Sequence, residues 1–212
     1  MEYPFADTGD IYEEMSIYLD DDGFKFKVNE QPSIENFEKV LGEKTIKVAK
    51  CVFNTEENFP NAKRNFINGV DFEGKLVDYL KVAPLWEDSN NEYLYCLTYN
   101  GKIVKIGMTI KTLKERYGSY MCGTRKAMKK GSCSSTNYVI TECNYFAMKN
   151  NYEVEIFAIK IPKETKTITR FGITREIEVS IARSLEEMIT DKFIDTYGHK
   201  PILCVQKGNS TK

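Results

Sequence analysis

The sequence predicts an α+β protein in which a small three-stranded antiparallel sheet is flanked by helices and preceded by an N-terminal extension. The run 93–107 reads as two strands joined by Asn100-Gly101, a dipeptide that tolerates the two positive φ angles of a type I′ hairpin turn. Residues 152–161 alternate between two faces, as a third strand would. Apolar residues at helical spacing follow Thr109 and Arg175, which predicts helices around the sheet.

The first 90 residues are interpreted as the extension, because Asp88-Ser89-Asn90-Asn91 forms a polar break before the first strand of the hairpin. The elements expected inside it are a strand over 23–28, a helix from Pro32-Ser33 to Leu41, a strand over 45–53 and a helix over 72–82. The Asn-rich segment 58–70 carries Lys63 and Arg64 and is expected to be a loop or a small lobe that touches phosphate. Nothing in this extension indicates a function.

The helix after the hairpin begins near the hydroxyl of Thr109 and places Arg116 and Tyr120 one turn apart on the same side. Several capping side chains at 134–137 predict a further helix that runs to about Lys149. The polar segment 163–175 is expected to form a protruding hairpin that reaches DNA, with Arg170 just before a turn at Phe171-Gly172. A last helix over about 175–195 completes the chain before the tail.

Composition bounds the class of protein. The chain has 212 residues, of which 42% are hydrophobic and 12% aromatic, and this composition is typical of a globular protein. No apolar run approaches a membrane span, and the acidic N-terminus lacks a secretory signal, so we expect a soluble, cytoplasmic protein that contacts no membrane. Six cysteines without a CxxC pair, and a single histidine, argue against a zinc site of the usual spacing and favour free thiols.

Charge is distributed unevenly along the chain, although the net charge is only −1. Residues 1–22 carry eight carboxylates and no Lys or Arg, whereas residues 102–130 carry nine basic side chains against Glu115 alone. An anionic partner would therefore be drawn to the stretch that contains the hairpin and its helix. Either run by itself is also compatible with an ordinary solvated surface.

Three short motifs resemble those of the GIY-YIG nuclease superfamily. Tyr93-Leu94-Tyr95 matches the first motif with its glycine lost, Lys105-Ile106-Gly107 matches the second with lysine in place of tyrosine, and Arg116 matches the helix arginine. The lysine, together with a tyrosine one turn after the arginine, is similar to a branch of type II restriction endonucleases. The resemblance covers residues 91–206, which would be the nuclease core, and leaves 207–212 as a tail.

The resemblance implies roles for five side chains. Tyr95 would be the general base, assisted by the ammonium of Lys105 because a phenol is mostly protonated at neutral pH. Arg116 and Tyr120 would hold the scissile phosphate. Glu186 would bind the divalent cation, Mg²⁺ or another such as Mn²⁺.

The choice of Glu186 over its neighbour Glu187 depends on two observations. The family pattern Leu-Glu-x-x-(Leu/Ile) aligns with residues 185–189 and selects Glu186. Glu186 also shares a helical stripe with apolar residues, whereas Glu187 follows Arg183 by four positions and suits a surface ion pair. Without the upstream motifs, both would be interpreted as solvated helix acids.

The function that this resemblance implies is metal-dependent cleavage of double-stranded DNA by a site-specific type II restriction endonuclease. It implies a homodimer on DNA, to which the extension contributes dimer contacts, base recognition or both, and a cognate DNA methyltransferase that is not a physical partner. The alternatives are a nucleic-acid-binding protein without catalysis and a homing or repair nuclease. The basic side chains expected to contact DNA are Lys111, Lys114, Arg125, Lys126, Lys129, Lys130 and Arg170.

Overall fold

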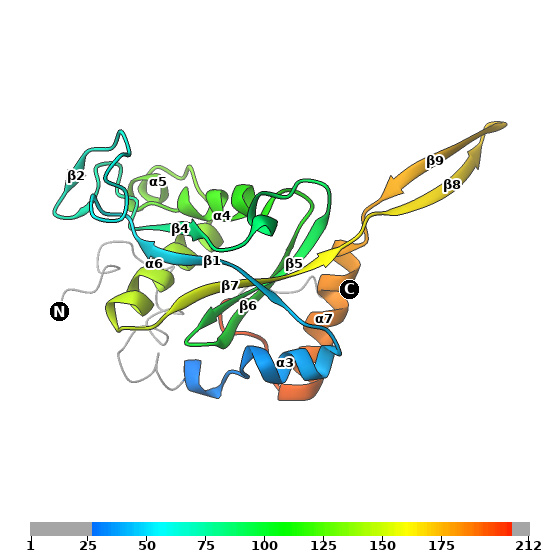
Figure 1. Cartoon of the computed structure of the whole chain (residues 1–212), viewed down its shortest axis with the longest axis horizontal. Coiled ribbons are helices and arrows are strands. Elements are labelled where there is room, and N and C mark those ends of the chain that lie inside the picture. Colours follow the sequence, from blue (N-terminus) through cyan, green and yellow to red (C-terminus); the bar gives the residue numbers. More distant parts are fainter. Residues whose placement is uncertain (1–26, 205–212) are drawn as a thin grey trace.

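The computed structural model describes residues 27–204 (Figure 1). Residues 27–30 form a helical turn, so the strand expected over 23–28 lies almost entirely outside the described residues, as do the acidic run 1–22 and the tail 207–212. The elements that follow are α3 (Ile34–Leu41), β1 (Ile46–Phe53), β2 (Phe66–Ile67), β3 (Val70–Asp71), β4 (Val77–Lys81), η2 (Pro84–Glu87), β5 (Glu92–Tyr99), β6 (Lys102–Thr109), α4 (Leu113–Met121), α5 (Arg125–Lys129), α6 (Ser135–Lys149), β7 (Val154–Ile161), β8 (Glu164–Arg170), β9 (Ile173–Val179) and α7 (Ala182–Tyr197).

The central sheet has five antiparallel strands in the order β4-β1-β7-β5-β6, so the prediction of a small three-stranded sheet is wrong. The predicted strands β5, β6 and β7 are adjacent, but β1 pairs with the free edge of β7 and β4 pairs with β1. An uncovered edge of β7 would present unpaired backbone N–H and C=O groups, and β1 satisfies them. Two strands from the predicted extension therefore belong to the sheet that carries the hairpin.

Two predicted helix assignments are also wrong. The segment predicted as a helix over 72–82 contains β4, because its short apolar run fits a strand period as well as a helical one. The last helix does not begin at Arg175, which lies in β9, because residues 173–179 alternate along a second strand. That helix, α7, begins at Ala182. The expected role of residues 1–90 in dimer contacts or base recognition stays a prediction.

The hairpin and the helices on either side of it follow local signals in the sequence. Asn100 and Gly101 have φ of 48° and 73°, as the predicted type I′ turn requires. Ser33 caps α3 by accepting a hydrogen bond from the backbone N–H of Asn36, and Ser134 caps α6 in the same way. The Ile34 backbone N–H donates to the Gly101 carbonyl, so the start of α3 is fixed against the hairpin turn.

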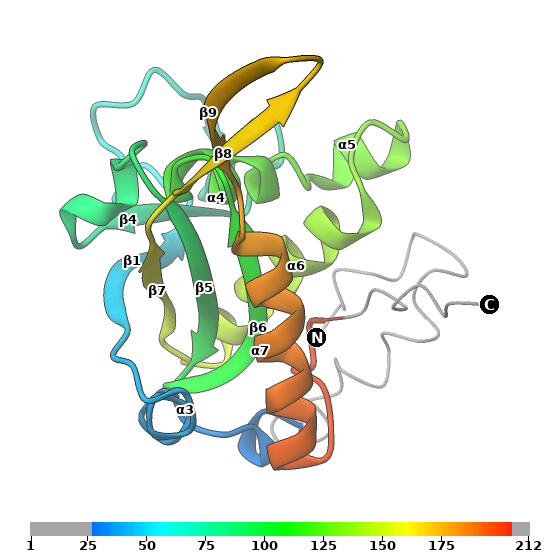
Figure 2. The same ribbon diagram turned by 90° about the vertical axis from the view of Figure 1, so that its right-hand side faces the viewer.

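Helices cover both faces of the sheet (Figure 2). On one face, α4 and α6 bury the ring of Tyr95 and its same-face neighbours along β5. On the other face, α3 and α7 cover Cys96 and Ile106 of the sheet, and Phe193 of α7 packs in the same cluster. All eight residues of β5 are buried, so β5 is the axis of the core, and β6 beside it forms one edge of the sheet. α7 lies along the edge strand β6 and its neighbour β5.

The ribbon of β8 and β9 projects away from this body and connects the end of β7 to the start of α7 (Figure 1). Its turn lies at Phe171-Gly172, where the sequence predicts it. All six cysteines are free thiols, as expected. No helix within residues 27–204 is both long and apolar enough to cross a membrane.

Candidate active site

The geometry of β5 and β6 places Tyr95 directly opposite Gly107, and Leu97 opposite Lys105. Side chains of directly opposed residues in an antiparallel pair point to the same face, so Tyr95 and Lys105 share the face covered by α4. The Tyr95 ring lies across Gly107, because a Cβ atom at that position would stand 2.4 Å from Tyr95 Oη and 2.5 Å from its Cζ. The glycine of the second motif is therefore the position that admits the tyrosine of the first.

A capping box fixes the start of α4. Thr112 Oγ1 accepts a hydrogen bond from the Glu115 backbone N–H at 3.0 Å, and Glu115 Oε2 accepts one from the Thr112 backbone N–H at 3.2 Å. Thr109, whose hydroxyl the sequence places near this helix start, does not cap the helix, since its hydroxyl accepts from the Lys111 backbone N–H within the preceding turn. The Thr-x-x-Glu pattern at 112–115 is the signal that would have located the helix start.

Tyr95, Arg116 and Tyr120 form a closed cluster of hydrogen bonds between β5 and α4. Arg116 Nε donates to Tyr95 Oη at 2.9 Å, and Arg116 Nη2 donates to Tyr120 Oη at 2.9 Å. The two phenol oxygens are 2.7 Å apart, and the guanidinium carbon lies 4.6 Å from the centroid of the Tyr120 ring. Burial raises the pKa of Tyr120, so this phenol keeps its proton. Either phenol can be the donor in the bond between them, and if Tyr120 donates, the Tyr95 oxygen accepts two hydrogen bonds, one from Tyr120 and one from Arg116.

The ring of Tyr117 packs against this cluster, a role that the sequence analysis did not predict. Its ring makes edge contacts with Tyr95 and Tyr120, at centroid distances of 5.2 and 5.3 Å. Its hydroxyl is buried and has no hydrogen-bond partner within the described residues. The only sequence signal is the spacing of Tyr117 between Leu113 and Tyr120 on one apolar stripe of α4. The ring therefore acts as packing that holds the two catalytic candidates in place.

Glu186 approaches the same edge of the sheet from α7. The Ala182 backbone N–H donates to Glu92 Oε2 at 3.2 Å, which ties the start of α7 to β5. Burial raises the pKa of the half-buried Glu186 carboxyl, while the charges of Lys105 and Arg116 act to lower it. The carboxylate is therefore within electrostatic reach of both cations. Lys105 has no hydrogen bond or ion pair with any residue that the structure describes.

Glu187 points elsewhere. It is exposed, and its Oε1 lies 3.5 Å from Arg183 Nε in the i, i+4 ion pair that the spacing suggests. This placement favours Glu186 over Glu187 as the metal ligand, although the assignment itself stays a prediction.

The surroundings of Glu186 suit a divalent cation. Within residues 27–204, its carboxylate makes no hydrogen bond or ion pair, so both oxygens are available to a ligand. The same range contains no group of three or more His, Cys, Asp or Glu side chains that could hold a metal ion. A lone protein carboxylate fits Mg²⁺, which keeps several water ligands and is commonly bound through one or two carboxylates and the phosphates of a substrate.

The basic side chains predicted to contact DNA lie at different places. Lys111, Lys126 and Lys130 are exposed and have no ion pair within the described part of the chain. Lys114 instead pairs with Glu87, at 2.7 Å from its Oε1. Arg170 lies on the projecting ribbon. The side chains of Arg125 and Lys129, on α5, lie outside the described part of the structure.

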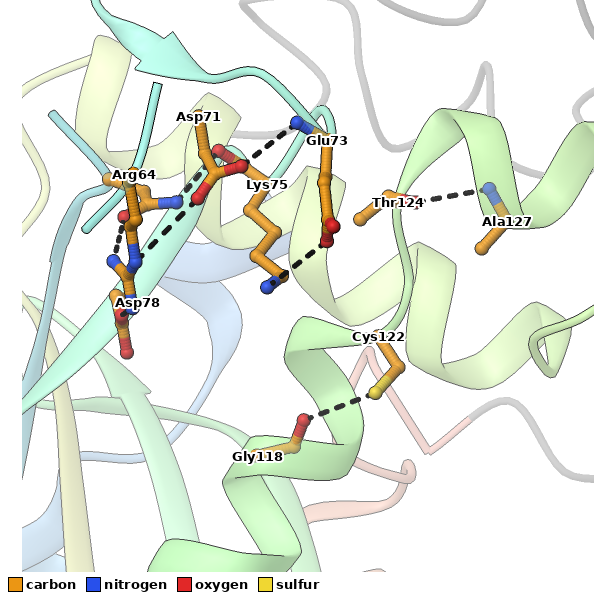
Figure 3. Close-up of polar contacts among 10 residues, drawn as sticks. Arg64, Asp71, Glu73, Lys75, Asp78, Gly118, Cys122, Thr124 and Ala127 are labelled. Atoms are coloured by element: carbon orange, nitrogen blue, oxygen red, sulfur yellow. Dashed lines mark hydrogen bonds and ion pairs between the residues drawn. The ribbon is translucent and has the colours of Figure 1, made fainter. Parts of the chain in front are cut away.

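The segment 58–70 forms a small lobe whose arginine is fully engaged within the protein. Arg64 Nη1 donates to Asn54 Oδ1 at 2.5 Å and Nη2 donates to Asp78 Oδ2 at 3.0 Å (Figure 3). Arg64 Nε also lies 3.6 Å from a carboxylate oxygen of Asp71. These contacts fix the lobe to β4. Because they occupy Arg64, the exposed Lys63 is the cation of segment 58–70 that could contact a phosphate.

No protein-family model matches the chain, and no curated protein sequence matches it. Among solved structures, the chain is similar to restriction endonuclease HPY188I in complex with product DNA, with 26% identity over 86% of this chain and 91% of that chain. It is also similar to a mutant of bacteriophage T4 EndoII, with 16% identity over 82% of this chain and 99% of that chain. The TM-score is 0.44 in both cases, and at this overlap neither similarity assigns a family or an activity to the chain.

Proposed function

We propose that this protein is a metal-dependent endonuclease of the GIY-YIG kind that hydrolyses phosphodiester bonds of double-stranded DNA as a type II restriction enzyme. The observation that supports the proposal most is the hydrogen-bonded cluster of Tyr95, Arg116 and Tyr120, with Lys105 and Glu186 at the same sheet edge. These are the side chains of the three motifs and of the late helix glutamate. These side chains come from four elements, β5, β6, α4 and α7, so their grouping is a result of the fold and not of closeness along the chain.

Each side chain has a chemical task in this proposal. Arg116 presents a planar fork of N–H donors, which suits the oxygens of a phosphodiester, and Tyr120 adds a hydroxyl beside it. Tyr95, once its hydroxyl has lost its proton, accepts the proton of the attacking water as a phenolate; in that state Arg116 Nε donates to its oxygen and the Tyr120 hydroxyl is placed to donate to it as well. Lys105 orients that water and offsets the negative charge that develops. A divalent cation held by Glu186 would supply Lewis-acid stabilisation of the phosphate.

The proposal is tested by incubating the purified chain with plasmid DNA and Mg²⁺ and looking for discrete fragments. Glu186→Gln is expected to abolish cleavage while DNA binding survives, because the amide keeps the shape of the side chain but cannot hold the cation. Glu187→Gln is the matched control and is expected to cleave normally, since Glu187 is paired with Arg183. Loss of cleavage in the Glu187 variant alone would move the metal ligand by one residue.

A second candidate function is binding of nucleic acid without catalysis. It is favoured by the burial of Tyr95 and Tyr120, which are 1% and 0% exposed and whose hydrogen bonds would also serve a purely structural purpose. Under this alternative, the wild-type chain shifts a DNA duplex in a native gel but leaves it intact in Mg²⁺ and in Mn²⁺. Discrete, metal-dependent fragments would exclude it.

For a type II enzyme that cuts both strands of a palindromic site, we propose a homodimer on DNA. One chain offers one such cluster, and a two-fold dimer reads a two-fold symmetric site with identical surfaces. Light scattering of the complex with duplex DNA should give two chains per duplex. A complex of one chain with one duplex that still cuts both strands would contradict the dimer.

A further inference from the structure

The ribbon of β8 and β9 has two faces of different chemistry. In the observed register, Lys166 stands opposite Ile177 and Ile168 opposite Arg175, so these side chains share one face. The full set on this basic and apolar face is Glu164, Lys166, Ile168, Arg170, Ile173, Arg175, Ile177 and Val179. The other face carries Thr165, Thr167, Thr169, Thr174, Glu176 and Glu178.

The basic face is available to a partner. Ile168, Ile173 and Ile177 are all exposed, although large apolar side chains are usually placed in a core. Arg170 and Arg175 have no ion pair with any residue in the described part of the chain. The opposite face is acidic and threonine-rich, so only one side of the ribbon presents positive charge to an anionic surface.

The tip of the ribbon carries a second unusual feature. Phe171 has φ of 50° and Gly172 has φ of 75°, so a bulky aromatic occupies a left-handed position that strongly favours Asn, Asp or Gly. The other hairpin of this chain uses Asn100-Gly101 for the same geometry. Phe171 is also fully exposed. Backbone strain and an exposed aromatic ring at the same residue indicate that the ring itself is needed outside the fold.

We propose that the β8–β9 ribbon lies in a groove of duplex DNA with its basic face against the sugar-phosphate backbone, and that Phe171 inserts at a base step and unstacks it. This inference rests on the proposed function, since it takes DNA to be the ligand. A two-stranded ribbon fits the width of the major groove, and apolar wedges such as Phe are the side chains that proteins insert between base pairs. Lys166, Arg170 and Arg175 supply the phosphate contacts along the way.

A second copy of this chain is a poorer occupant of the same face. Pairing two basic faces in a symmetric dimer would bring Arg170 and Arg175 of both copies together, and like charges across an interface oppose association. Polyanionic DNA meets the same charges with attraction. The charge distribution on the ribbon therefore favours DNA.

The position of the ribbon also fixes where the unstacked step should lie. β9 leads into α7, whose second turn carries Glu186, so the base of the ribbon adjoins the candidate active site. A seven-residue strand extends roughly 23 Å. This length corresponds to about seven base pairs of DNA at ~3.4 Å each. The distorted step is therefore expected within about seven base pairs of the cleaved bond.

The experiment probes base stacking in overlapping long duplexes that together cover the plasmid used in the cleavage assay, so that the probed DNA includes any cleavage site. The full chain is bound in EDTA, and the complex is treated with permanganate, which attacks unstacked thymines, and with diethyl pyrocarbonate, which attacks unstacked purines. Wild type and Phe171→Trp should create reactive bases at a fixed distance from the site. Phe171→Asn should abolish that reactivity and weaken DNA binding by roughly tenfold, which is the order expected for one lost stacking contact.

Two controls separate a wedge from a structural role. Phe72→Ala, which removes another exposed phenylalanine just after the small lobe, should leave base reactivity unchanged. Phe171→Asn should melt at a temperature equal to or above that of wild type, because Asn tolerates the left-handed backbone better than Phe. A stable Phe171→Asn protein that has lost base reactivity cannot be explained by misfolding.

Several results would overturn the wedge. Unchanged reactivity in Phe171→Asn, or no reactive bases with wild type bound, would show that Phe171 does not unstack DNA. A wild-type dimer that becomes monomeric in Phe171→Asn without DNA would show that the tip joins two copies instead. Reactive bases without Mg²⁺-dependent cleavage would support insertion of Phe171 and reject the proposed function. Cleavage without reactive bases would support the proposed function and reject the insertion. A chain that binds no DNA would reject both.

Discussion

Substituting Gly107 by alanine tests whether the two motif strands form one site. The added Cβ would stand 2.4 Å from Tyr95 Oη and 2.9 Å from Tyr95 Cε2, whereas ordinary contacts are 3.4–4 Å. The Tyr95 ring must therefore move by ~1 Å or more, and overpacking of this kind typically costs about 1–3 kcal/mol of unfolding free energy. The same movement breaks the hydrogen bond that Tyr95 accepts from Arg116, at 2.9 Å, and the one between the Tyr95 and Tyr120 hydroxyls, at 2.7 Å.

We expect Gly107→Ala to lower the rate constant of DNA cleavage by roughly 10²-fold, the order that a 1 Å misplacement of a catalytic group can produce. Single-turnover cleavage measures the rate. Thermal melting measures the loss of stability, because the melting temperature should fall by about 2–4 °C for each kcal/mol in a chain of this size. The matched control is Gly118→Ala on α4, where an added Cβ meets nothing within 4 Å. That variant should keep its activity and gain up to about 1 kcal/mol, because alanine is the better helix former. Wild-type cleavage by Gly107→Ala would refute the placement of Tyr95 in the active site.

Three further predictions concern neighbouring groups. Lys105→Met should slow single-turnover cleavage by roughly 10²-fold with little change in DNA affinity, since only the ammonium is lost, while Lys102→Met stays near wild type. Because burial raises the pKa of Glu186, protons should compete with Mg²⁺ as the pH falls through a value above 4.5, the ordinary glutamate value, and the half-saturating Mg²⁺ concentration should then rise. A half-saturating Mg²⁺ concentration that does not change down to pH 4.5 would contradict this. Lys105→Met should move the start of this rise to higher pH, because the Lys105 charge lowers the pKa of Glu186 and the variant lacks that charge. Tyr117→Phe should raise the unfolding free energy by about 1 kcal/mol in a denaturant titration, because it removes a buried hydroxyl that has no hydrogen-bond partner in the described part of the chain, and a loss of stability would show that the hydroxyl has one.

Much of the candidate site could be predicted from the sequence because its signals are local. The two positive φ angles of a type I′ turn identify Asn100-Gly101, and the turn then sets the register that pairs the two motif strands. Helical periodicity places Arg116 and Tyr120 one turn apart whatever surrounds them. The i, i+4 relation of Arg183 and Glu187 likewise follows from spacing, and it leaves Glu186 without an ion pair among residues 27–204.

The tertiary structure decided what depends on distant partners. The sheet has five strands because β1 pairs with the edge of β7. Backbone hydrogen bonding between segments remote in the chain does not depend on a particular residue pattern in either segment, so the sequence did not predict this pairing. A short apolar run such as Val77–Lys81 fits two periods, and only the neighbouring strand β1 selects one of them. The electrostatic interaction of Glu186 with Lys105 and Arg116 likewise depends on how α7 and α4 pack against the sheet. Spacing along the chain determines which side chains share a face, whereas contact between faces depends on how the elements pack together.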